Sequence, residues 1–592
     1  MAQELRSINL VAPAFKGINT EDSPLAQDPS FAEIADNAII DKRGRIAARK
    51  GYDVITTNKT VLGTETLRAI REFRDNAGNS KIFSVGNNKI ISGTTTLVDE
   101  TPGSYTITAD NWKMVDFNDS IYFFQRGYEP LVYSNSSSAV QKMSTLAGAS
   151  GASDIPKANE VLAAYGRLWC ADVTNNKSTV YWSDLLIGQN WTGGTSGSID
   201  ISKVWPDGYD EIVSLAAHNG LLIIFGQHSI VVYQGAEAPA TMSLADTVAG
   251  VGCVDRDTVQ QTGVDVIFLS HTGLRSFGRT IQEKSMPIST LSRTITKDII
   301  SLIQGETQFF RSIYSPEENF YLLTFVGQQT TFCFDVRGTL EDGSFRVTRW
   351  PGSIFTAYER LTDGTLYVGT TNGVSEYKGY SDNGVRYRFK YFSPSLTFGD
   401  ASRLKILKKI KPTLVGANSA TVFMKFAYDF GTSYRTTEFT VGNQQPAFFN
   451  VSEYPTYSEL SSYGISSTFV EDINGVSFVN GTTGYYEVDQ FLGEFTSHPT
   501  TGSGGGSVLN GDSYFNTAED IYYVYIEGSF VDLTTLTPTS FSEFTGGELT
   551  NQRSLNAVGS GTTVVVGLES DINGFALSLQ EINLLALIGK TL

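Results

Sequence analysis

The stretch GLLIIFGQHSIVVYQG (220–235) decides the fold class of this chain. Two apolar runs, LLIIF and SIVVY, flank a short polar segment that begins with glycine. Both runs are rich in β-branched and aromatic residues, which favour strands. The stretch therefore predicts a β-hairpin.

The same unit recurs from about residue 62 to residue 380 at intervals of roughly 40–55 residues. Its other copies are KIFSVGNNKIISG (81–93), SIYFFQRGYEPLVYS (120–134), GRLWCADVTNNKSTVYWSD (166–184), DVIFLSHTGLRSFG (265–278), NFYLLTFVGQQTTFCFD (319–335) and GTLYVGTTNGVSEYKG (364–379). Hairpins at this period indicate a β-propeller, in which a ring of blades leaves only short exposed edges. We expect an all-β chain with a propeller over 61–385, with six blades favoured and seven, or an incomplete ring, as the alternatives.

Two segments have the spacing of helices. SFAEIADNAI (30–39) has apolar residues at helical intervals, with Ser30 as N-cap and Glu33 three residues later. It lies in an otherwise irregular N-terminal segment (1–60), to which we assign docking or closure. TLSRTITKDIISLIQG (290–305) predicts an amphipathic helix between two blades.

The pattern changes after residue 385. Residues 386–398 and 403–416 carry clustered bases, and residues 419–439 alternate like a strand. The stretch TTVVVGLESDINGFALSLQEINLLALIGK (562–590) resumes strong β patterning. Its last run also fits a helix, but the β-branched TTVVV and the Asn-Gly turn before it favour a strand. Between them lies a Tyr-, Phe-, Gly- and Ser-rich stretch. We expect a β-sandwich formed by 386–444 and 551–592, split by an inserted β-rich domain (445–550).

Composition limits the cellular class. Charged residues are only 18% and aromatics 12%, which argues against disorder. The first residues lack the pattern of a signal peptide, and no apolar run reaches the length of a membrane span. Three widely spaced cysteines suit buried thiols in a reducing compartment rather than disulfides or a zinc site: Cys170, Cys253 and Cys333.

Charge is unevenly placed. The net charge is −18, and from residue 440 to residue 592 seventeen acids face two bases, giving 2 − 17 = −15. This segment is either an ordinary solvated acidic domain or a wall that does not bind a polyanion, since nucleic-acid affinity comes from Lys and Arg. A basic run, either a solvated loop or a docking edge for an acidic partner, lies near the N-terminus: Lys42, Arg43, Arg45, Arg49 and Lys50.

Signals of catalysis are sparse. The chain has four histidines, none paired at metal-ligand spacing, and it lacks the nucleophile-elbow, zinc-protease and phosphate-loop motifs. The acids Glu317, Glu318 and Asp363 lie in turn-like segments, where carboxylates are ordinarily solvated. We expect no enzyme activity, no cofactor and no metal.

Three stretches together resemble the tail nozzle proteins of short-tailed bacteriophages. They are KGINTEDSPLAQDPSFAEIADNAIIDKRGRIAARKGY (16–52), GVGCVDRDTVQQTGVDVIFLSHTGLRSF (250–277) and FAYDFGTSYR (426–435). The first is similar to the opening of that family through Ala35, Asn37, Asp41, Gly44, Arg49, Gly51 and Tyr52. The resemblance touches both the propeller and the sandwich, and the order of the stretches along the chain carries it.

The resemblance implies a structural virion protein. The expected assembly is a homo-hexamer below an adaptor ring, which retains packaged DNA, conducts it during ejection without binding it specifically, and docks tail fibres or tailspikes. It would assemble in the host cytoplasm and lie in the distal tail, with 445–550 as the tip. The adaptor-docking candidates are Arg43, Arg45, Arg49 and Lys50, and charge placement suggests the channel or gate candidates Glu471, Asp472, Glu487, Asp489, Glu519 and Asp520.

Two alternatives remain at this point. A carbohydrate-binding or carbohydrate-active propeller, such as a receptor-binding tail protein, would use exposed aromatic rings and close carboxylates. An adhesin or surface-layer propeller is disfavoured by the absence of a signal-peptide pattern.

Overall fold

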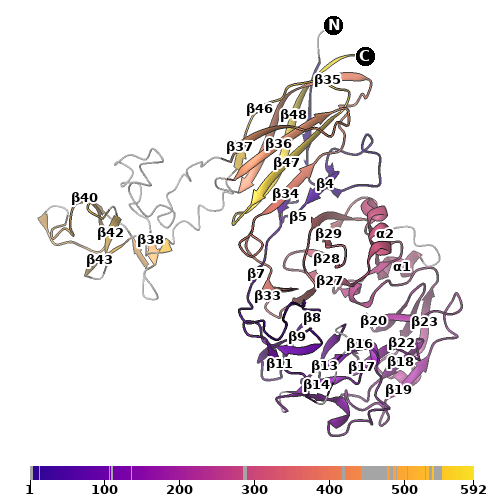
Figure 1. The fold of residues 1–592 in the computed structure, drawn as a ribbon. Coiled ribbons are helices and arrows are strands. Elements are labelled where there is room, and N and C mark those ends of the chain that lie inside the picture. Colours follow the sequence, from indigo (N-terminus) through magenta and orange to yellow (C-terminus); the bar gives the residue numbers. More distant parts are fainter. Residues whose placement is uncertain are drawn as a thin grey trace. The chain divides into compact units, whose positions relative to one another are not determined.

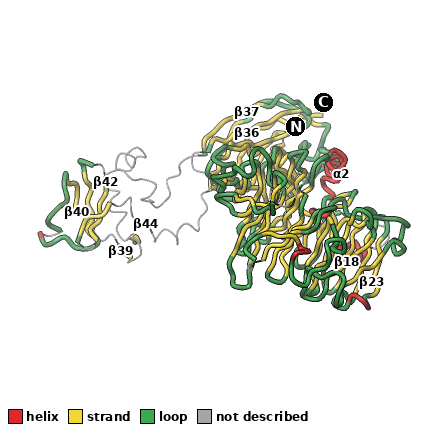
Figure 2. Tube along the Cα trace, turned by 60° about the horizontal axis from the view of Figure 1, so that its bottom comes forward, coloured by secondary structure: helices red, strands yellow, loops and turns green. Residues whose placement is uncertain are grey.

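The computed structural model describes most of the chain. The described residues are 4–11, 14–103, 105, 107, 111–134, 137–283, 290–416, 420–441, 477–479, 485–487, 490–502, 505–519, 521–526, 528–532, 537–538 and 550–591. The chain divides into two compact units. Unit 1 comprises Met1–Thr413, Thr421–Phe439 and Arg553–Leu592, and unit 2 comprises Leu414–Ala420 and Thr440–Gln552. Both are mostly β, with few helical segments (Figure 2).

Seven small antiparallel sheets follow one another in the described part of unit 1 (Figure 1). Sheets one to four are β8 (Ala69–Arg74), β9 (Ser80–Gly86), β10 (Lys89–Ser92) and β11 (Val98–Asp99); β12 (Lys113–Phe117), β13 (Ser120–Phe124), β14 (Leu131–Ser134) and β15 (Val140–Lys142); β16 (Ala158–Ala164), β17 (Arg167–Val173), β18 (Thr179–Trp182) and β19 (Gly197–Asp200); and β20 (Ile212–His218), β21 (Leu221–Gly226), β22 (Ile230–Gln234) and β23 (Ser243–Val248).

Sheets five to seven complete the series. They are β24 (Gln260–Gln261), β25 (Val266–Ser270) and β26 (Gly273–Ser276); β27 (Phe310–Ser315), β28 (Phe320–Phe325), β29 (Thr330–Thr339) and β30 (Phe345–Pro351); and β31 (Ala357–Arg360), β32 (Leu366–Thr370) and β33 (Gly373–Glu376) with β7 (Asp53–Val54). The strand that completes sheet seven therefore comes from the N-terminal segment, through the pairing of Ser375 with Val54.

The hairpin of sheet four explains why its apolar runs are unbroken. Leu222 and Ile224 of β21 pack in a core shared with the tryptophans of sheet three. Ile223 and Phe225, which alternate with them, pack in a core shared with Phe268 of sheet five. A strand that buries both faces has no polar positions to alternate.

The same side-by-side packing links the first sheet to the last. Ile70 of sheet one shares a core with Ala357 and Val374 of sheet seven. The first strands of sheets one to four are neighbours in the order β8, β12, β16, β20. The loop before sheet five contacts both β20 and β27, and β27 is followed by β31, which contacts β8 again. Contacts therefore return to sheet one after sheet seven.

Two larger sheets form a sandwich-like part. Sheet six continues through β4 (Ile34–Asp36) into β34 (Tyr387–Phe392), β47 (Val564–Ile572), β36 (Thr421–Tyr428) and β37 (Arg435–Thr440), giving nine strands. A seven-stranded sheet contains β45 (Thr550–Gln552), β35 (Arg403–Gly416), β48 (Leu577–Thr591), β6 (Ile46–Ala48) and β5 (Ala38–Ile40), with β1 (Glu4–Leu10) on β48 and β46 (Leu555–Asn556) on β35. Sheet six and the strands β34, β47, β36 and β37 of the sandwich-like part therefore belong to one continuous hydrogen-bonded sheet.

The last run of the sequence is a strand, which decides against the helix alternative. Ile582, Leu584, Ala586 and Ile588 are buried, and the residues between them are less so. This period of two follows the pleat of β48, whose register pairs it with β1.

The helix expected over 30–39 is wrong. The chain there forms β3 (Phe31–Ala32), which pairs with β2 (Gly17–Ile18), and then β4 and β5. Asn37 lies between β4 and β5 with φ 52°, a left-handed conformation that a helix excludes. The apolar residues match helical spacing, but β4 bridges β30 and β34 and so gains hydrogen bonds that an isolated helix would not supply.

The second expected helix is present over part of its length. A 3-10 turn, η4 (Arg293–Ile295), leads into α2 (Thr296–Gly305). A short helix that the sequence did not indicate, α1 (Phe277–Glu283), follows sheet five. Three further 3-10 turns are η1 (Met143–Thr145), η2 (Pro239–Thr241) and η3 (Arg256–Thr258).

The described strands between residues 477 and 538 form two sheets. One contains β40 (Gln490–Phe495), β41 (Asp512–Asn516), β42 (Ile521–Ile526) and β43 (Ser529–Asp532). The other contains β39 (Tyr485–Glu487), β38 (Ser477–Val479) and β44 (Thr537–Pro538). Tyr514 is fully buried in the first sheet, where its ring stacks on that of Tyr523 with centroids 5.5 Å apart.

Candidate functional site: an ion-pair network between the first strands

Charged side chains occupy the first strands of five of the seven sheets. They are Arg71 on β8, Lys113 on β12, Glu160 on β16, Arg311 on β27 and Glu359 on β31. Contacts between neighbouring strands link these positions in a series: β8 contacts β12 and β31, β12 contacts β16, and β27 contacts β31. We call these residues, together with Asp116 and the loop 255–258, the central network.

Arg71 links three sheets. Its Nε lies 2.9 Å from Oδ2 of Asp116 on β12, and its Nη1 lies 3.7 Å from Oε1 of Glu359 on β31. Glu359 also accepts a hydrogen bond of 3.1 Å from the backbone N–H of Glu72. Burial raises the pKa of Glu359 to about 7, although Arg71 opposes the rise. Burial likewise raises the pKa of Asp116.

Glu160 joins sheets two, three and four. Its side chain is fully buried, and its two oxygens lie 2.8 and 2.6 Å from Nζ of Lys113. The Oγ of Ser214 and the backbone N–H of Leu215, both on β20, donate to the same carboxylate at 3.2 Å. Burial raises the pKa of Glu160 despite the neighbouring Lys113.

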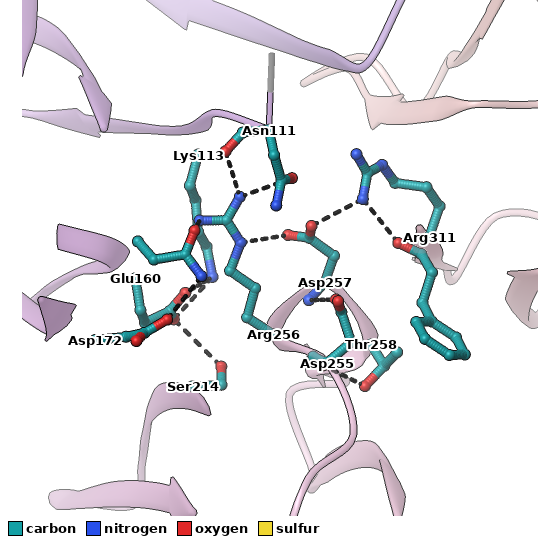
Figure 3. Close-up of polar contacts among 12 residues, drawn as sticks. Asn111, Lys113, Glu160, Asp172, Ser214, Asp255, Arg256, Asp257, Thr258 and Arg311 are labelled. Atoms are coloured by element: carbon teal, nitrogen blue, oxygen red, sulfur yellow. Dashed lines mark hydrogen bonds and ion pairs between the residues drawn. The ribbon is translucent and has the colours of Figure 1, made fainter. Parts of the chain in front are cut away.

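The loop before sheet five supplies the centre of the network (Figure 3). Asp255 caps the turn η3 by accepting a 2.8 Å hydrogen bond from the N–H of Asp257. Arg256 donates to Oδ1 of Asn159 at 3.1 Å and to the carbonyl of Asn111 at 3.0 Å. Asp257 accepts a 2.9 Å bond from Nη1 of Arg311.

The two carboxylates of this loop differ in acidity. Burial, assisted by the charge of Asp257, raises the pKa of Asp255 to about 6. Burial acts on Asp257 in the same direction, but Arg256 and Arg311 outweigh it and lower the pKa of that carboxyl. Asp257 therefore stays ionised beside Arg256 and Arg311.

Two cavities adjoin the network. One, of about 200 Å³, is lined by Arg71, Lys113, Arg311 and Glu359 among others. The other, of about 170 Å³, is lined by polar residues of sheets two to four, Asp172 included. Arg256 lines both cavities and is almost fully buried.

Several of the carboxylates that line these cavities are paired with cations. Asp257 and Glu359, the carboxylates that line the larger cavity, contact arginines, and Asp172 in the smaller cavity accepts from Lys177 at 2.5 Å and from Arg126. Buried charges are stable only when they are paired and hydrogen-bonded. A raised pKa is compatible with acid–base chemistry, but here it follows from burial inside an ion-pair network.

Two residues of the basic run in the N-terminal segment, Arg45 and Arg49, are buried. Arg45 is buried, and its Nε lies 2.6 Å from Oδ2 of Asp41. Lys50 places its Nζ 2.5 Å from Oε1 of Glu318. Only Arg43 of the four docking candidates is exposed. Since a buried, paired arginine offers little surface to a partner, the docking interpretation of Arg45 and Arg49 is corrected to a role inside the fold.

Arg49 is the centre of a joint between the N-terminal segment and the sheets. Its guanidinium forms two hydrogen bonds to Asp382, at 2.8 and 2.7 Å, and its Nε donates to Oδ1 of Asn37 at 3.0 Å. The ring of Tyr387 lies under the guanidinium at 4.2 Å. Gly51 follows in close contact with the backbone of Ser381, where an added Cβ would lie 1.8 Å from the carbonyl oxygen.

The acidic candidates lie in unit 2, and four of the six are outside the described residues: Glu471, Asp472, Asp489 and Asp520. Glu487 ends β39, and only its backbone is described. Glu519 is exposed and accepts from Nδ2 of Asn516 at 2.7 Å and from the hydroxyl of Tyr523 at 2.8 Å. The channel and gate assignment of these six acids therefore stays a prediction.

The central network was missed by sequence reasoning, but the sequence contains a signal for it. Charged residues recur among apolar ones inside the first strands, as in AIREFR (69–74), ANEVLAA (158–164) and FRSIYS (310–315). The three cysteines, in contrast, are buried and free as expected.

Two negative findings concern only the described residues. Within those ranges, no three His, Cys, Asp or Glu side chains gather as they would around a metal ion. No helix in the same ranges is long and apolar enough to cross a membrane.

Comparison with known proteins gives no family. No protein-family model and no curated protein matches the chain. Among solved structures, the extracellular domain of the hybrid two-component system BT4673 of B. thetaiotaomicron is 10% identical, with a TM-score of 0.38, over 82% of this chain and 52% of that one. PorZ, a surface component of the type-IX secretion system of Porphyromonas gingivalis, is 12% identical, with a TM-score of 0.33, over 80% and 59%.

The computationally designed Ika8 protein is 12% identical, with a TM-score of 0.31, over 55% of this chain and 99% of that one. This chain thus spans about half the length of BT4673's domain. Likenesses of this strength carry no argument about fold or function.

Proposed function

We propose that this chain is a structural subunit of the tail nozzle of a short-tailed bacteriophage. In this proposal, six copies form a ring in the distal tail below the adaptor ring. The ring retains the packaged DNA, conducts it during ejection without binding it specifically, and docks tail fibres or tailspikes. The chain performs no catalysis and needs no cofactor, and its assembly takes place in the host cytoplasm.

The observation that carries the proposal is the role of the N-terminal stretch 31–54. It supplies β4 to the nine-stranded sheet, β5 and β6 to the seven-stranded sheet, and β7 to sheet seven. The residues that carry the resemblance, Arg49 and Gly51 among them, form the joint between these sheets. A stretch used in this way is expected of a rigid scaffold whose function is mechanical.

The proposal includes a finer description of the fold as a seven-bladed propeller. The shared core of sheets one and seven, and the order of contacts among the first strands, support seven blades over the six that the sequence favoured. Strand β7 would then close the ring by completing the last blade with N-terminal residues. Closure of this kind protects sheet edges.

Charge supports the account of conduction. Unit 2 contains fourteen carboxylates and neither Lys nor Arg between residues 440 and 552. A surface of this sign repels the phosphate backbone over about a Debye length, ~8–10 Å. The candidates Glu471, Asp472, Glu487, Asp489, Glu519 and Asp520 remain proposals for the channel wall.

Electron microscopy of the full chain tests the proposal directly. Negative-stain averages of the purified protein should show rings with six-fold symmetry and a central opening. Antibody against the chain should label the distal tail of virions. A chain that stays monomeric over a wide concentration range, and that is absent from virions, contradicts the proposal.

A second test concerns conduction. The ring should not retain double-stranded DNA in a filter-binding assay at physiological salt. A variant in which Glu471, Asp472, Glu487 and Asp489 are changed to Lys should retain it, with an affinity that falls steeply as salt rises. Equal retention by both proteins would contradict the proposed acidic wall.

One observation favours carbohydrate binding as a second candidate. Phe495, with 37% of its surface exposed, and the exposed His498 lie beside the buried Tyr514 on β41. The ring of His498 also stacks on that of Phe530 with centroids 5.1 Å apart. Exposed ring faces stack on sugars, so a glycan array probed with the full chain tests this candidate, and the Phe495→Ala variant should lose any signal.

A further inference from the structure

A pocket of about 500 Å³ lies between three segments of unit 1. These segments are the N-terminal stretch 14–31, the turn η4, and the turn that joins β29 to β30. The pocket's volume falls within the range of about 300–1,000 Å³ typical of ligand sites. Its large apolar side chains are Phe15, Phe31 and Leu340. We call it the N-terminal pocket.

Four carboxylates also line the N-terminal pocket: Glu21, Asp22, Glu341 and Asp342. Asp342 is paired, because its Oδ2 lies 2.5 Å from Nη1 of Arg293. Within the part of the chain that the structure describes, the other three form no ion pair with a lysine or arginine. Three acids at the pocket are therefore without a cation.

Hydrogen bonds hold two of these acids in place. Oδ1 of the buried Asn19 accepts from the N–H groups of Glu21 and Asp22 at 3.1 Å each, and its Nδ2 donates to Oδ2 of Asp22 at 2.7 Å. The carboxylate of Glu21 also accepts from the N–H of Lys297 in the first turn of α2. Both acids thus belong to a preformed turn, so little has to be ordered when a ligand binds.

The bases beside the pocket already have acidic partners. Lys16 pairs with Asp28 at 2.6 Å, and Arg346 shares Asp335 with a second arginine. The whole group has four bases and six acids, a formal charge of 4 − 6 = −2: Lys16, Arg293, Arg337 and Arg346 against Glu21, Asp22, Asp28, Asp335, Glu341 and Asp342. The charge balance of the pocket favours a cation.

A buried hydroxyl points independently to a ligand. Thr294 lines the pocket and is 5% exposed, and its Oγ1 is buried without a hydrogen-bond partner among the described residues. A buried polar group left unpaired costs about 1–3 kcal/mol, so such a group is rare in a native fold. A ligand that donates a hydrogen bond to Thr294 would supply the missing partner.

We propose that the N-terminal pocket binds a primary ammonium group on an apolar stem, the chemistry of a lysine side chain. The stem packs on Phe15, Phe31 and Leu340, and the ammonium group donates to Thr294 and to the unpaired carboxylates. Aromatic faces also attract cations. The chain itself shows this at the pocket, where Nζ of Lys16 lies 5.7 Å from the centre of the Phe31 ring.

Binding of small amines to the full chain tests the proposal. The probes are Nα-acetyl-lysine-N-methylamide, which represents a lysine within a polypeptide, and 1,5-diaminopentane, which represents a free amine. Saturation-transfer NMR should detect at least one of them with a Kd of about 1 mM or tighter. The Nε-acetylated form of the lysine probe keeps the stem but lacks the charge, and it should bind at least about tenfold more weakly. Equal binding of the charged and acetylated probes, or binding of neither amine, would overturn the proposal.

The same measurement distinguishes the two sources of the ammonium group. If the lysine probe binds at least as tightly as the diamine, the pocket accepts a side chain attached to a polypeptide, and the ligand is a docking protein. If only the diamine binds, the ligand is a free amine. Both results support the assignment of the pocket to an ammonium group.

Carboxylate variants locate the binding site. Glu341→Gln and Asp22→Asn each remove one unpaired charge with little change in shape, and each should weaken binding of the amine by about tenfold. Glu65→Gln is the matched control, because Glu65 is an exposed acid of unit 1 that does not line the pocket. The control should bind like the unmodified chain. Unchanged affinity in both pocket variants would place the amine elsewhere and refute the proposed site.

Thr294→Val tests the hydroxyl separately. Since the hydroxyl has no partner among the described residues, its removal should leave stability in urea unchanged or raised, while affinity for the amine falls several-fold. A loss of stability together with unchanged affinity would show that the hydroxyl serves the fold and not a ligand. Near-UV circular dichroism establishes that each variant is folded.

These outcomes are independent of the proposed function. A chain that binds the amine but forms no ring keeps this inference and loses the nozzle proposal. A ring that binds neither amine does the reverse.

Discussion

The central network predicts an unusual pH dependence of stability, and replacement of Glu359 should remove the part that this carboxyl contributes. Glu359 is 9% exposed, and burial raises its pKa from an ordinary value near 4.5 to about 7. Between these values the folded chain holds a proton that the unfolded chain has lost. Stability contributed by this group is therefore present below pH 4.5 and is lost as pH rises through 7.

The magnitude follows from the two pKa values of Glu359, one in the folded chain and one in the unfolded chain. A tenfold difference in proton affinity between the folded and the unfolded chain corresponds to about 1.4 kcal/mol of folding stability. A measurement at pH 5 and at pH 8.5 covers most of the interval between the two pKa values of Glu359. Over that range the unmodified chain should lose about 2–3 kcal/mol through Glu359. The Glu359→Gln variant has no such proton to lose, so its stability relative to the unmodified chain should rise by the same amount.

Thermal unfolding of both proteins at the two pH values measures the effect. The entropy of unfolding is about 2.1 cal/mol/K per residue, so for a folded part of this size the melting temperature changes by roughly 1 °C per kcal/mol. The difference in melting temperature between Glu359→Gln and the unmodified chain should therefore grow by about 2–3 °C from pH 5 to pH 8.5. Comparing differences cancels the constant cost of the substitution. Arg71 keeps Asp116 as a partner in the variant, which limits that cost.

Glu317→Gln is a control of opposite sign. Its hydrogen bonds to Arg360 lower the pKa of Glu317 to about 2, so the stability it contributes is lost only as pH falls through that value. Between pH 5 and pH 8.5 the difference from the unmodified chain should be constant. A Glu359→Gln difference that is equally constant would refute the assignment of a raised pKa to Glu359.

Three further predictions concern the joint and the core. Arg49→Met should destabilise unit 1 by about 3 kcal/mol, because it leaves Asp382 without its partner. The control Lys42→Met, at an exposed position nearby, should change the free energy of unfolding by less than about 0.5 kcal/mol. Urea unfolding of both variants measures the two changes. Gly51→Ala should prevent soluble folding, measured by soluble yield, since no Cβ fits against Ser381. A thiol reagent should label none of the three cysteines until the chain unfolds, because burial raises the pKa of each: Cys170, Cys253 and Cys333.

The repeated hairpins were predictable because their signal is local. In the stretch 220–235, both faces of each strand pack on neighbouring sheets, so the apolar runs are continuous and the turn between them is the only polar break. The final strand was predictable for a related reason, since Asn573 and Gly574 form a turn before an apolar run with a period of two.

The structure of the N-terminal segment could not be predicted in this way. Residues 30–39 have helical spacing and a plausible cap, yet their structure is fixed by β30 and β34, which follow more than 300 residues later. Propensity is a weak determinant when tertiary hydrogen bonds compete with it. The same distance hides the partner of Arg49, since Asp382 lies 333 residues further along the chain.

The central network shows why charge is useful where apolar packing would be more stable. Apolar cores between successive sheets are chemically alike, so they do not distinguish one order of sheets from another. Among the ion pairs of the described residues, Arg71 pairs with acids on sheets two and seven, Lys113 with an acid on sheet three, and Arg311 with an acid on the loop before sheet five. A misordered arrangement would bury unpaired charges at a cost of about 3–5 kcal/mol each. The network therefore selects the order in which the sheets meet, and we expect its removal to impair correct assembly of unit 1 more than it lowers the stability of the assembled fold.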